Sequence, residues 1–240
     1  RLLHATWRQL GGKLGGDIKA GDWPADATVW QSWASAPLGQ LVRDINKFSN
    51  NVMARQLFLS MAWPSASGAP GAANAPGTAK AASPAEVPAA GPATAPATLD
   101  KARAAISQVV RQGTPDGSGH SACEGDALVL DNGAGLSRLE RSNARCLGRW
   151  LQAMWAGPTM PEFIASLPIT GLDGTARKLQ NVSGRAHIKT GSLDGVAALA
   201  GYVEGDSGRR WVVVGVVNHP QADAARPALA ALLGWAMKDQ

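Results

Sequence analysis

The sequence predicts an α+β domain in which an antiparallel sheet is flanked by helices. Apolar residues recur at helical spacing through much of the first half of the chain, and three β-like runs follow one another near its end, at residues 187–193, 196–203 and 211–217. Because the strands are grouped and do not alternate with helices, the order favours antiparallel pairing over parallel βαβ units. With 240 residues, of which 45% are hydrophobic, the chain can bury a core.

Three helices are expected before the middle of the chain. The first covers residues 1–15 and weakens at Gly11 and Gly12. Residues 21–36 are rich in Trp and turn-forming residues, and we expect an irregular crossing with a short strand there. Pro37 starts the second helix, which ends at residues 46–48.

Ser49 begins the third helix, which continues to Met61. In the simplest interpretation, the Ser49 hydroxyl is an N-cap that accepts from a free amide of the first turn. Asn51 is then a polar surface residue of that turn.

Residues 64–98 are of low complexity. Pro and Ala occupy 21 of these 35 positions, and the only charged residues are Lys80 and Glu86. Such a composition buries too little apolar surface to offset the entropy lost on ordering, so we expect a disordered surface insertion. In this hypothesis residues 1–63 and 99–240 are two parts of one domain.

Beyond the insertion, a helix is expected over residues 99–112, and a short strand at 128–130 leads into a loop at 131–138. Two glycines in such a loop suit a backbone that lines a cleft. Ser142 is expected to cap a helix that continues to Met154. The remaining elements are a helix at 160–167, a turn at 172–175 and a closing helix at 222–238.

The first of the three expected strands carries the most informative residues. Alternation places Ala186 and Ile188 on one face and His187 and Lys189 on the other. Gly191 removes a Cβ where another backbone needs to approach closely. We interpret His187 as a solvated strand residue and not as a catalyst.

Charge and composition exclude several classes of protein. The net charge is +5 and the pI is near 9.6, but the basic residues are scattered without interleaved aromatic residues, which argues against nucleic-acid binding. An anionic polymer such as a cell wall is compatible with this charge. No apolar run approaches the ~20 residues needed for a transmembrane segment. The His and Cys residues show no metal-ligand spacing, so no metal is expected.

Cys123 and Cys146 are the only two cysteines. They suit one disulfide in an oxidising compartment, which would contribute about 3 kcal/mol. The alternative is two separate, small, buried apolar residues.

Two short motifs far apart in the chain belong together. Ser-x-x-Lys, Ser-x-Asn and Lys-Thr-Gly are the signature of penicillin-binding proteins and class A β-lactamases. The second is present as Ser49-Asn50-Asn51 and the third as Lys189-Thr190-Gly191, in the expected order. The sequence contains no Ser-x-x-Lys.

The chain resembles the D-alanyl-D-alanine carboxypeptidase/endopeptidases, the class C low-molecular-mass penicillin-binding proteins of the bacterial periplasm. The resemblance covers nearly all of the chain outside the insertion. It rests on residues 46–51, 131–138, 171–175, 189–193 and 200–203. One departure is Asn132-Gly133-Ala134, where the family more often has Gly-Ser.

The resemblance implies a β-lactamase/transpeptidase-like domain that is incomplete at its N-terminus. It implies serine acyl transfer on the D-Ala-D-Ala end of peptidoglycan stem peptides, without a cofactor, and inhibition by β-lactams. The nucleophile and its activating lysine are then expected upstream of residue 1, together with a secretion signal that directs the protein to the periplasm.

The resemblance also implies roles for individual residues. Ser49 passes a proton between the expected upstream lysine and the leaving amine, and Asn51 holds a backbone carbonyl of the substrate. Lys189 sets a positive charge against the terminal carboxylate of the substrate, and Thr190 hydrogen-bonds the same group.

The strand that follows these residues is expected to bind the substrate backbone. Its edge after Gly191 pairs with the peptide as an added strand. The amide of Ser192 is then the second donor of the oxyanion hole. Arg138 lies in the loop that the family uses for side-chain recognition.

Two alternatives remain open. One is a non-catalytic fragment or degenerate relative that binds peptidoglycan without turnover, which the missing nucleophile favours. The other is a serine β-lactamase, which shares the architecture; the loop at 131–138 and the Gly171–Thr175 turn argue against it. The sequence leaves the balance of carboxypeptidase and endopeptidase activity and the oligomeric state open.

Overall fold

The computed structural model describes residues 2–16, 21, 26–28, 31, 34–62, 97–112, 121–123 and 127–239. Contacts between residues divide the chain into two units, of which the first holds helix α1 and the second holds all later elements. Helix α1 covers Leu2–Gln9. It ends earlier than predicted because Gly11 takes a left-handed backbone, with a φ of 85°.

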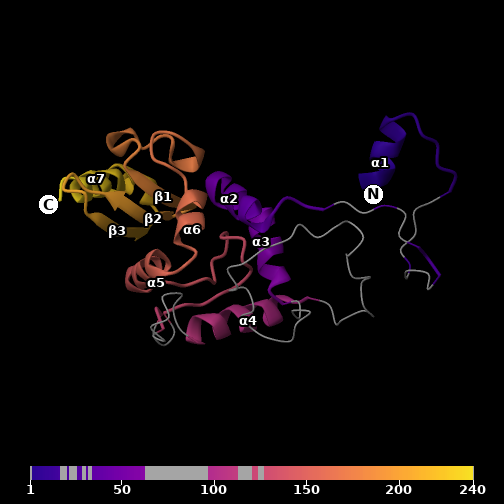
Figure 1. The fold of residues 1–240 in the computed structure, drawn as a ribbon, viewed down its shortest axis with the longest axis horizontal. Coiled ribbons are helices and arrows are strands. Elements are labelled where there is room, and N and C mark those ends of the chain that lie inside the picture. Colours follow the sequence, from indigo (N-terminus) through magenta and orange to yellow (C-terminus); the bar gives the residue numbers. More distant parts are fainter. Residues whose placement is uncertain are drawn as a thin grey trace. The chain divides into compact units, whose positions relative to one another are not determined.

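The second unit contains six α-helices among its described residues (Figure 1). They are α2 (Leu38–Phe48), α3 (Asn51–Ser60), α4 (Leu99–Gln112), α5 (Ala144–Ala156), α6 (Met160–Ser166) and α7 (Arg226–Met237). Each coincides with a helix expected from apolar periodicity. None of the helices that the structure describes is long and apolar enough to cross a membrane.

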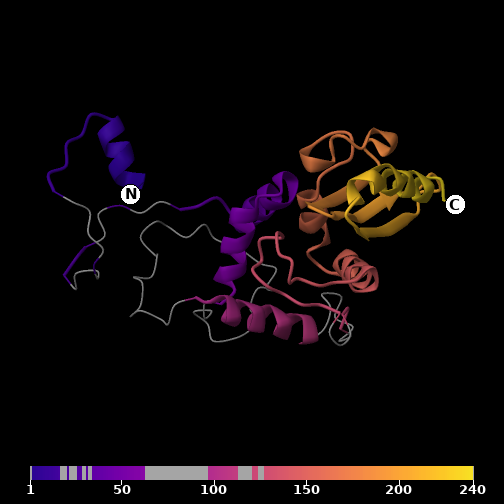
Figure 2. The ribbon, with the colours of Figure 1, turned by 180° about the vertical axis from the view of Figure 1, so that it is seen from behind.

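The predicted antiparallel meander is confirmed. Strands β1 (Ala186–Leu193), β2 (Val196–Glu204) and β3 (Arg210–Asn218) pair in the order β1-β2-β3. Figure 1 labels the three strands, and Figure 2 shows the same fold from behind. Both pairs are antiparallel, and Lys189 lies opposite Ala200, which in turn lies opposite Val214. Strand β1 is therefore an edge strand in this sheet.

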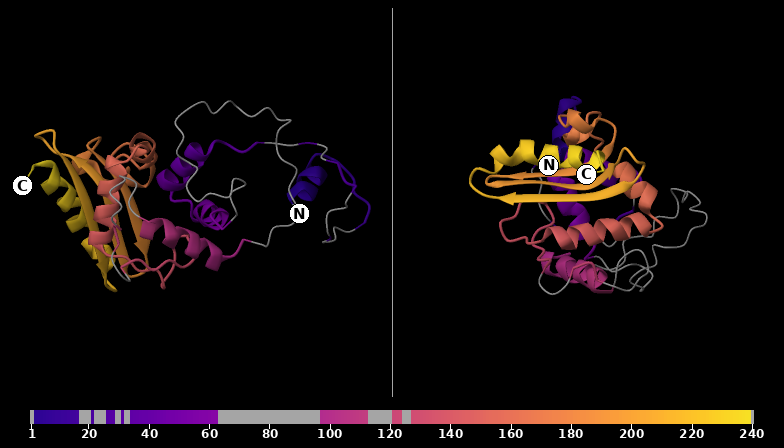
Figure 3. Two further views of the ribbon diagram at one scale, coloured as in Figure 1. Left: turned by 60° about the horizontal axis from the view of Figure 1, so that its bottom comes forward. Right: turned by 90° about the vertical axis from the view of Figure 1, so that its left-hand side faces the viewer.

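Helices cover both faces of the sheet, as Figure 3 shows in its right-hand view. On one face α7 contributes Leu233 and Ala236 to a core that includes Ile188 of β1. On the other face Leu151 of α5 packs with Tyr202 of β2. The arrangement is the predicted α+β class, with the sheet between two helical layers.

Strand β1 shows the predicted alternation. Ala186 and Ile188 are fully buried against the α7 layer. The prediction that His187 is solvated is wrong: it is half-buried, and its Nδ1 lies 3.1 Å from the carbonyl oxygen of Ile164 in α6. Burial lowers the pKa of His187 below 6.5.

Two predicted helix caps are each displaced by one residue. The N-cap of α3 is Asn50, whose side chain accepts from the Met53 amide at 3.0 Å. Ser49 cannot serve, because its left-handed backbone ends α2. Likewise Asn143, and not Ser142, caps α5 by accepting from the Cys146 amide at 2.8 Å. In both cases the asparagine next to the expected serine has the extended backbone that an N-cap requires.

Some other boundaries also differ from the expectation. Residues 128–130 form no strand; Val129 makes only an isolated bridge to Arg141. A turn of 3-10 helix at Ala222–Ala225 precedes α7. The described residues between 21 and 36 carry no strand, and the rest of that stretch lies outside the described residues. So does nearly all of the expected insertion, except Ala97 and Thr98.

Cys123 and Cys146 are joined by a disulfide. The bond ties the chain between α4 and α5 to the first turn of α5.

Candidate active site

The structure brings Ser49 and Lys189 together across 140 residues of sequence. The Lys189 Nζ lies 3.0 Å from the Ser49 Oγ, and it also donates to the carbonyl oxygen of Thr190 at 2.8 Å. Lys189 projects from β1, and Ser49 lies at the junction of α2 and α3. An ammonium can only donate, so the Ser49 oxygen accepts and its own proton is available to another acceptor.

Ser49 is held in an unusual conformation. Its φ and ψ are 53° and 47°, in the left-handed region that residues other than glycine rarely adopt. Among the described residues only Asp239 shares a positive φ without being a glycine. Because this geometry costs energy, surrounding contacts must determine it.

Those contacts fix the last turn of α2. Lys47 donates to the Leu167 carbonyl at 2.9 Å and pairs with Asp173 at 2.5 Å. Asn46 donates to the buried Ser166 hydroxyl at 2.8 Å. Gly174 has a φ of 52°, and a Cβ there would collide with the Lys47 carbonyl oxygen. The segment after α6 therefore braces the residues that precede Ser49.

Lys189 is largely enclosed. No ion pair found among the described residues joins it to a carboxylate. Burial lowers its pKa below the ordinary value of 10.5. An enclosed ammonium without a protein counter-ion suits the binding of an anionic group from outside the chain.

Asn51 is oriented by the loop that follows α4. Its Nδ2 donates to the Ala134 carbonyl oxygen at 2.5 Å, between residues 83 positions apart. Because a carbonyl only accepts, the amide nitrogen must face the loop, which leaves its second N–H and its oxygen for other partners.

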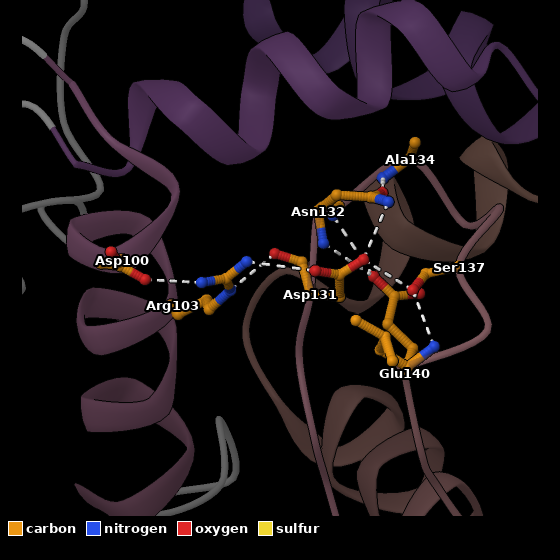
Figure 4. Close-up of polar contacts among 9 residues, drawn as sticks. Asp100, Arg103, Asp131, Asn132, Ala134, Ser137 and Glu140 are labelled. Atoms are coloured by element: carbon orange, nitrogen blue, oxygen red, sulfur yellow. Dashed lines mark hydrogen bonds and ion pairs between the residues drawn. The ribbon is translucent and has the colours of Figure 1, made fainter.

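The loop is held by a polar network around Asp131 (Figure 4). The Asp131 carboxylate accepts from Ser137 at 2.6 Å and from Asn132 at 3.0 Å, and Arg103 of α4 lies 3.1 Å away. The Ser137 hydrogen bond, with the charge and hydrogen bond of Arg103, outweighs burial and lowers the pKa of Asp131 below 3.8. Arg103 also donates to the Asp131 carbonyl at 2.7 Å, so α4 anchors the loop twice.

Glycine is required at one point in the loop. Gly133 has a φ of 69°, and a Cβ there would overlap the side chain of Phe58 in α3. The Glu140 carboxylate accepts from the Gly133 amide at 3.3 Å. This close approach brings the loop onto α3 and puts Ala134 within reach of Asn51.

The outer edge of β1 is occupied for half of its length. The Ala186 carbonyl accepts from the Thr170 amide at 3.0 Å, and the Ile188 amide donates to Pro168 at 2.8 Å. Backbone groups of alternate residues point to the same edge, so Thr190 and Ser192 present theirs on that side too. There the edge borders a cleft of about 510 Å³.

The cleft combines residues from four parts of the chain. It is lined by Ser49, Asn51, Gly133, Ala134, Gly135, Thr175, Lys189, Thr190, Gly191 and Ser192, among others. Thr190 Oγ1 donates to the hydroxyl of Thr175 at 2.9 Å. Six of the seven residues singled out from the motifs thus lie together.

Arg138, the seventh, lies outside this cleft. It lines a neighbouring hollow of about 720 Å³ that shares Gly135, Gly191 and Ser192 with the cleft. Its guanidinium is 3.5 Å from Asp194, and both side chains are exposed. The described residues contain no group of three or more His, Cys, Asp or Glu that could hold a metal ion.

The motifs did not reveal the bracing residues. Lys47, Asp173, Thr175 and Asp131 lie within the quoted sequence stretches, but no role was assigned to them. Their nearness to other site residues in the sequence could have indicated this role. Lys47 is two residues from Ser49, and Thr175 follows the turn that holds Lys47.

Comparison with known proteins identifies the class. The model of the D-Ala-D-Ala carboxypeptidase 3 (S13) family matches residues 1–82 and 95–238. The chain therefore belongs to this family. It is 28% identical over 236 residues to a D-alanyl-D-alanine carboxypeptidase of Actinomadura sp. (strain R39). This match covers 93% of this chain and 37% of that relative.

Solved structures share the fold. Penicillin binding protein 4 from Haemophilus influenzae, solved in complex with a β-lactam, matches with a TM-score of 0.67 at 18% identity. That match covers 97% of this chain and 50% of the other. A predatory endopeptidase from Bdellovibrio bacteriovorus, in complex with an immunity protein, gives a TM-score of 0.57 at 13% identity, over 85% of this chain and 44% of the other. The chain thus has the fold of the penicillin-binding proteins and spans at most about half the length of these relatives.

Proposed function

We propose that this chain supplies the Ser-x-Asn and Lys-Thr-Gly parts of a serine-type D-Ala-D-Ala carboxypeptidase/endopeptidase that acts on peptidoglycan stem peptides. The observation that carries the proposal is the 3.0 Å contact between Lys189 and Ser49, which meet in one cleft with Asn51. Membership of the D-Ala-D-Ala carboxypeptidase 3 family supports the substrate class.

The proposed reaction proceeds through an acyl-enzyme. A serine from a Ser-x-x-Lys motif, expected upstream of residue 1, forms an ester bond to the carbonyl carbon of the penultimate D-Ala. The amide C–N bond breaks, and the departing amine of the terminal residue takes up a proton. Water then cleaves the ester, which releases the shortened peptide and restores the serine.

In this reaction the upstream lysine of the Ser-x-x-Lys motif takes the proton of the attacking serine. Ser49 accepts this proton from the lysine and passes its own proton to the leaving amine. The Lys189 ammonium donates to the Ser49 oxygen, which keeps the Ser49 proton directed away from Lys189. The left-handed backbone of Ser49 fixes the hydroxyl relative to β1. Positioned proton transfer of this kind contributes about a hundredfold or more to the rate.

The edge of β1 binds the peptide as an added strand. The amide of Ser192 faces the cleft and is proposed as an oxyanion-hole donor, a type of contact worth about 3 kcal/mol of barrier. Lys189 and Thr190 then hold the terminal carboxylate, for which the Thr190 hydroxyl exchanges its hydrogen bond to Thr175 for one to the carboxylate. Asn51 offers its second N–H to a backbone carbonyl of the substrate, and Arg138 recognises a stem-peptide side chain from the neighbouring hollow.

We further propose that the whole protein works in the periplasm and is inhibited by β-lactams. The disulfide between Cys123 and Cys146 is consistent with an oxidising compartment. The β-lactam bound by penicillin binding protein 4 of Haemophilus influenzae supports the inhibitor class.

The test uses a labelled penicillin and intact-mass measurement on two proteins. One is this chain, and the other is the gene product extended upstream to include the expected Ser-x-x-Lys, called here the extended protein. We expect one adduct on the extended protein and none on the 240-residue chain. An adduct on the shorter chain would contradict the assignment of the nucleophile.

If neither protein forms an adduct but the extended protein binds cell-wall sacculi saturably, the non-catalytic alternative replaces this proposal. Rapid hydrolysis of nitrocefin by the extended protein would instead favour the β-lactamase.

A further inference from the structure

Arg226, the first residue of α7, contacts the hydroxyl of Ser192 at the end of the cleft. Its Nη2 lies 2.6 Å from the Ser192 Oγ. Asp223 holds the same guanidinium, with its Oδ1 2.9 Å from Nε and 2.8 Å from Nη2. The short turn before α7 therefore orients a permanent positive charge toward the cleft-lining strand.

The direction of this hydrogen bond is determined by chemistry. A guanidinium has five N–H donors and no acceptor, so the Ser192 oxygen must accept. The Ser192 proton then points away from Arg226. Among the residues that the structure describes, no hydrogen bond from the Ser192 hydroxyl to an acceptor is found.

Ser192 differs in this respect from its neighbour Thr190. The Thr190 hydroxyl already donates to Thr175 at 2.9 Å. Ser192 lines both the cleft and the adjoining hollow, and its side chain is exposed. Among the hydroxyls next to Lys189 on β1, that of Ser192 thus has a proton ready for an incoming acceptor.

We propose that Arg226 is a positioning residue that presents the Ser192 hydroxyl as a donor to a carboxylate bound beside Lys189. Donation from the guanidinium polarises the hydroxyl and strengthens the hydrogen bond that it gives. The inference rests on the proposed function, because it concerns the carboxylate that this function places in the cleft. It adds a residue from α7, outside all of the sequence motifs, to substrate recognition.

The test compares benzylpenicillin with its methyl ester, which lacks the carboxylate. The second-order rate of adduct formation is measured for both compounds on the extended protein, and the acid-to-ester ratio is the readout. Arg226→Gln is expected to lower this ratio about five- to tenfold, the effect of one weakened hydrogen bond to a charged group. In a Ser192→Ala background the same substitution is expected to change the ratio by less than about twofold, because the group through which Arg226 acts is gone.

A matched control removes a similar charge elsewhere. Arg209 lies exposed in the turn between β2 and β3, at the end of the sheet opposite Ser192. Arg209→Gln is expected to leave the ratio unchanged. The thermal midpoint of each variant shows whether it is folded.

Three outcomes would overturn the inference. Equal slowing of both compounds by Arg226→Gln would indicate a purely structural role. An undiminished effect in the Ser192→Ala background would show that Arg226 acts on the ligand by its own charge. An unchanged ratio would show that Arg226 has no influence on carboxylate recognition. Failure of the unaltered extended protein to form any adduct would instead refute the proposed function, so the two failures are distinguishable.

Discussion

Ser49 contacts Lys189 and has a backbone conformation that serine seldom adopts. The left-handed conformation aims the hydroxyl at Lys189 while ending α2 and leaving Asn50 free to cap α3. At the residue scale, these two consecutive positions have different roles: Ser49 ends α2 and Asn50 caps α3, so the simplest interpretation of Ser49, as an N-cap, is wrong. Neighbouring polar residues compete for a cap, and the backbone decides between them.

Two substitutions at Ser49 distinguish the effect of its backbone conformation on stability from the effect of its hydroxyl on acylation. Both Ser49→Gly and Ser49→Ala remove the hydroxyl, but only glycine relieves the left-handed backbone. We expect the glycine variant of the extended protein to be more stable than the alanine variant by about 1 kcal/mol. Thermal unfolding measures this difference. Identical melting temperatures would argue against a strained Ser49, and in either case penicillin acylation should slow about a hundredfold.

The burial of Lys189 predicts how carboxylate recognition depends on pH. Burial lowers its pKa, so the ammonium loses its proton at a lower pH than a free lysine, whose value is 10.5. The preference for benzylpenicillin over its methyl ester should therefore decline as the pH rises, with a midpoint below 10.5. Below that midpoint lysine is charged and attracts the carboxylate; above it the attraction is lost. Lys189→Arg stays charged and should not show this decline, and a midpoint at or above 10.5 would contradict the assignment.

At the scale of elements, helices and strands with a regular apolar spacing were predicted more accurately than short segments without one. The bounds of α4 and the order of β1, β2 and β3 follow from apolar spacing, and in β1 the residues predicted for one face, Ala186 and Ile188, belong to the core. The short strand at residues 128–130 was not found, since only Val129 has a bridging partner. Three residues are too few for periodicity to distinguish a strand from an extended loop.

The motifs identified six residues that line one cleft, but they did not predict which contacts hold those residues in place. The hydrogen bond from Asn51 to Ala134 and the ion pair between Lys47 and Asp173 join segments more than 80 residues apart. Such contacts depend on tertiary packing, and no local pattern encodes them. Arg138 shows the converse, because its loop was predicted to line the cleft and its side chain lies in the adjoining hollow.

Substitutions at two glycines test how closely the loop at 131–138 approaches α3. Gly133 lies in this loop, and Gly148 in α5 is the control. Gly133→Ala would place a Cβ against Phe58 on a left-handed backbone, with a φ of 69°. We expect a loss of about 3 kcal/mol in the free energy of unfolding. Gly148 lies within α5 with open space around it, so Gly148→Ala should stabilise the protein by about 0.5 to 1 kcal/mol. Urea unfolding compares the two; similar effects would contradict the close approach of the loop to α3.

For the whole molecule, the disulfide provides a test that requires no ligand. Cys123 and Cys146 are 23 residues apart, and closing a loop of this size stabilises a protein by about 3 kcal/mol. Adding a reductant should lower the midpoint of urea unfolding accordingly. A Cys123→Ala/Cys146→Ala double variant is the control and should not respond. An unaltered midpoint in the original protein would contradict a stabilising bond.

The contact between Ser49 and Lys189 also bears on how the length of this chain can vary in evolution. The two residues are 140 positions apart, so the cleft closes a very long stretch of polypeptide. The entropy of closure grows only with the logarithm of that length, and each doubling costs about 0.6 kcal/mol. Residues can therefore be gained or lost between Ala62 and Ala97 with little effect on the equilibrium that assembles the cleft. The stretch rich in Pro and Ala lies in this interval.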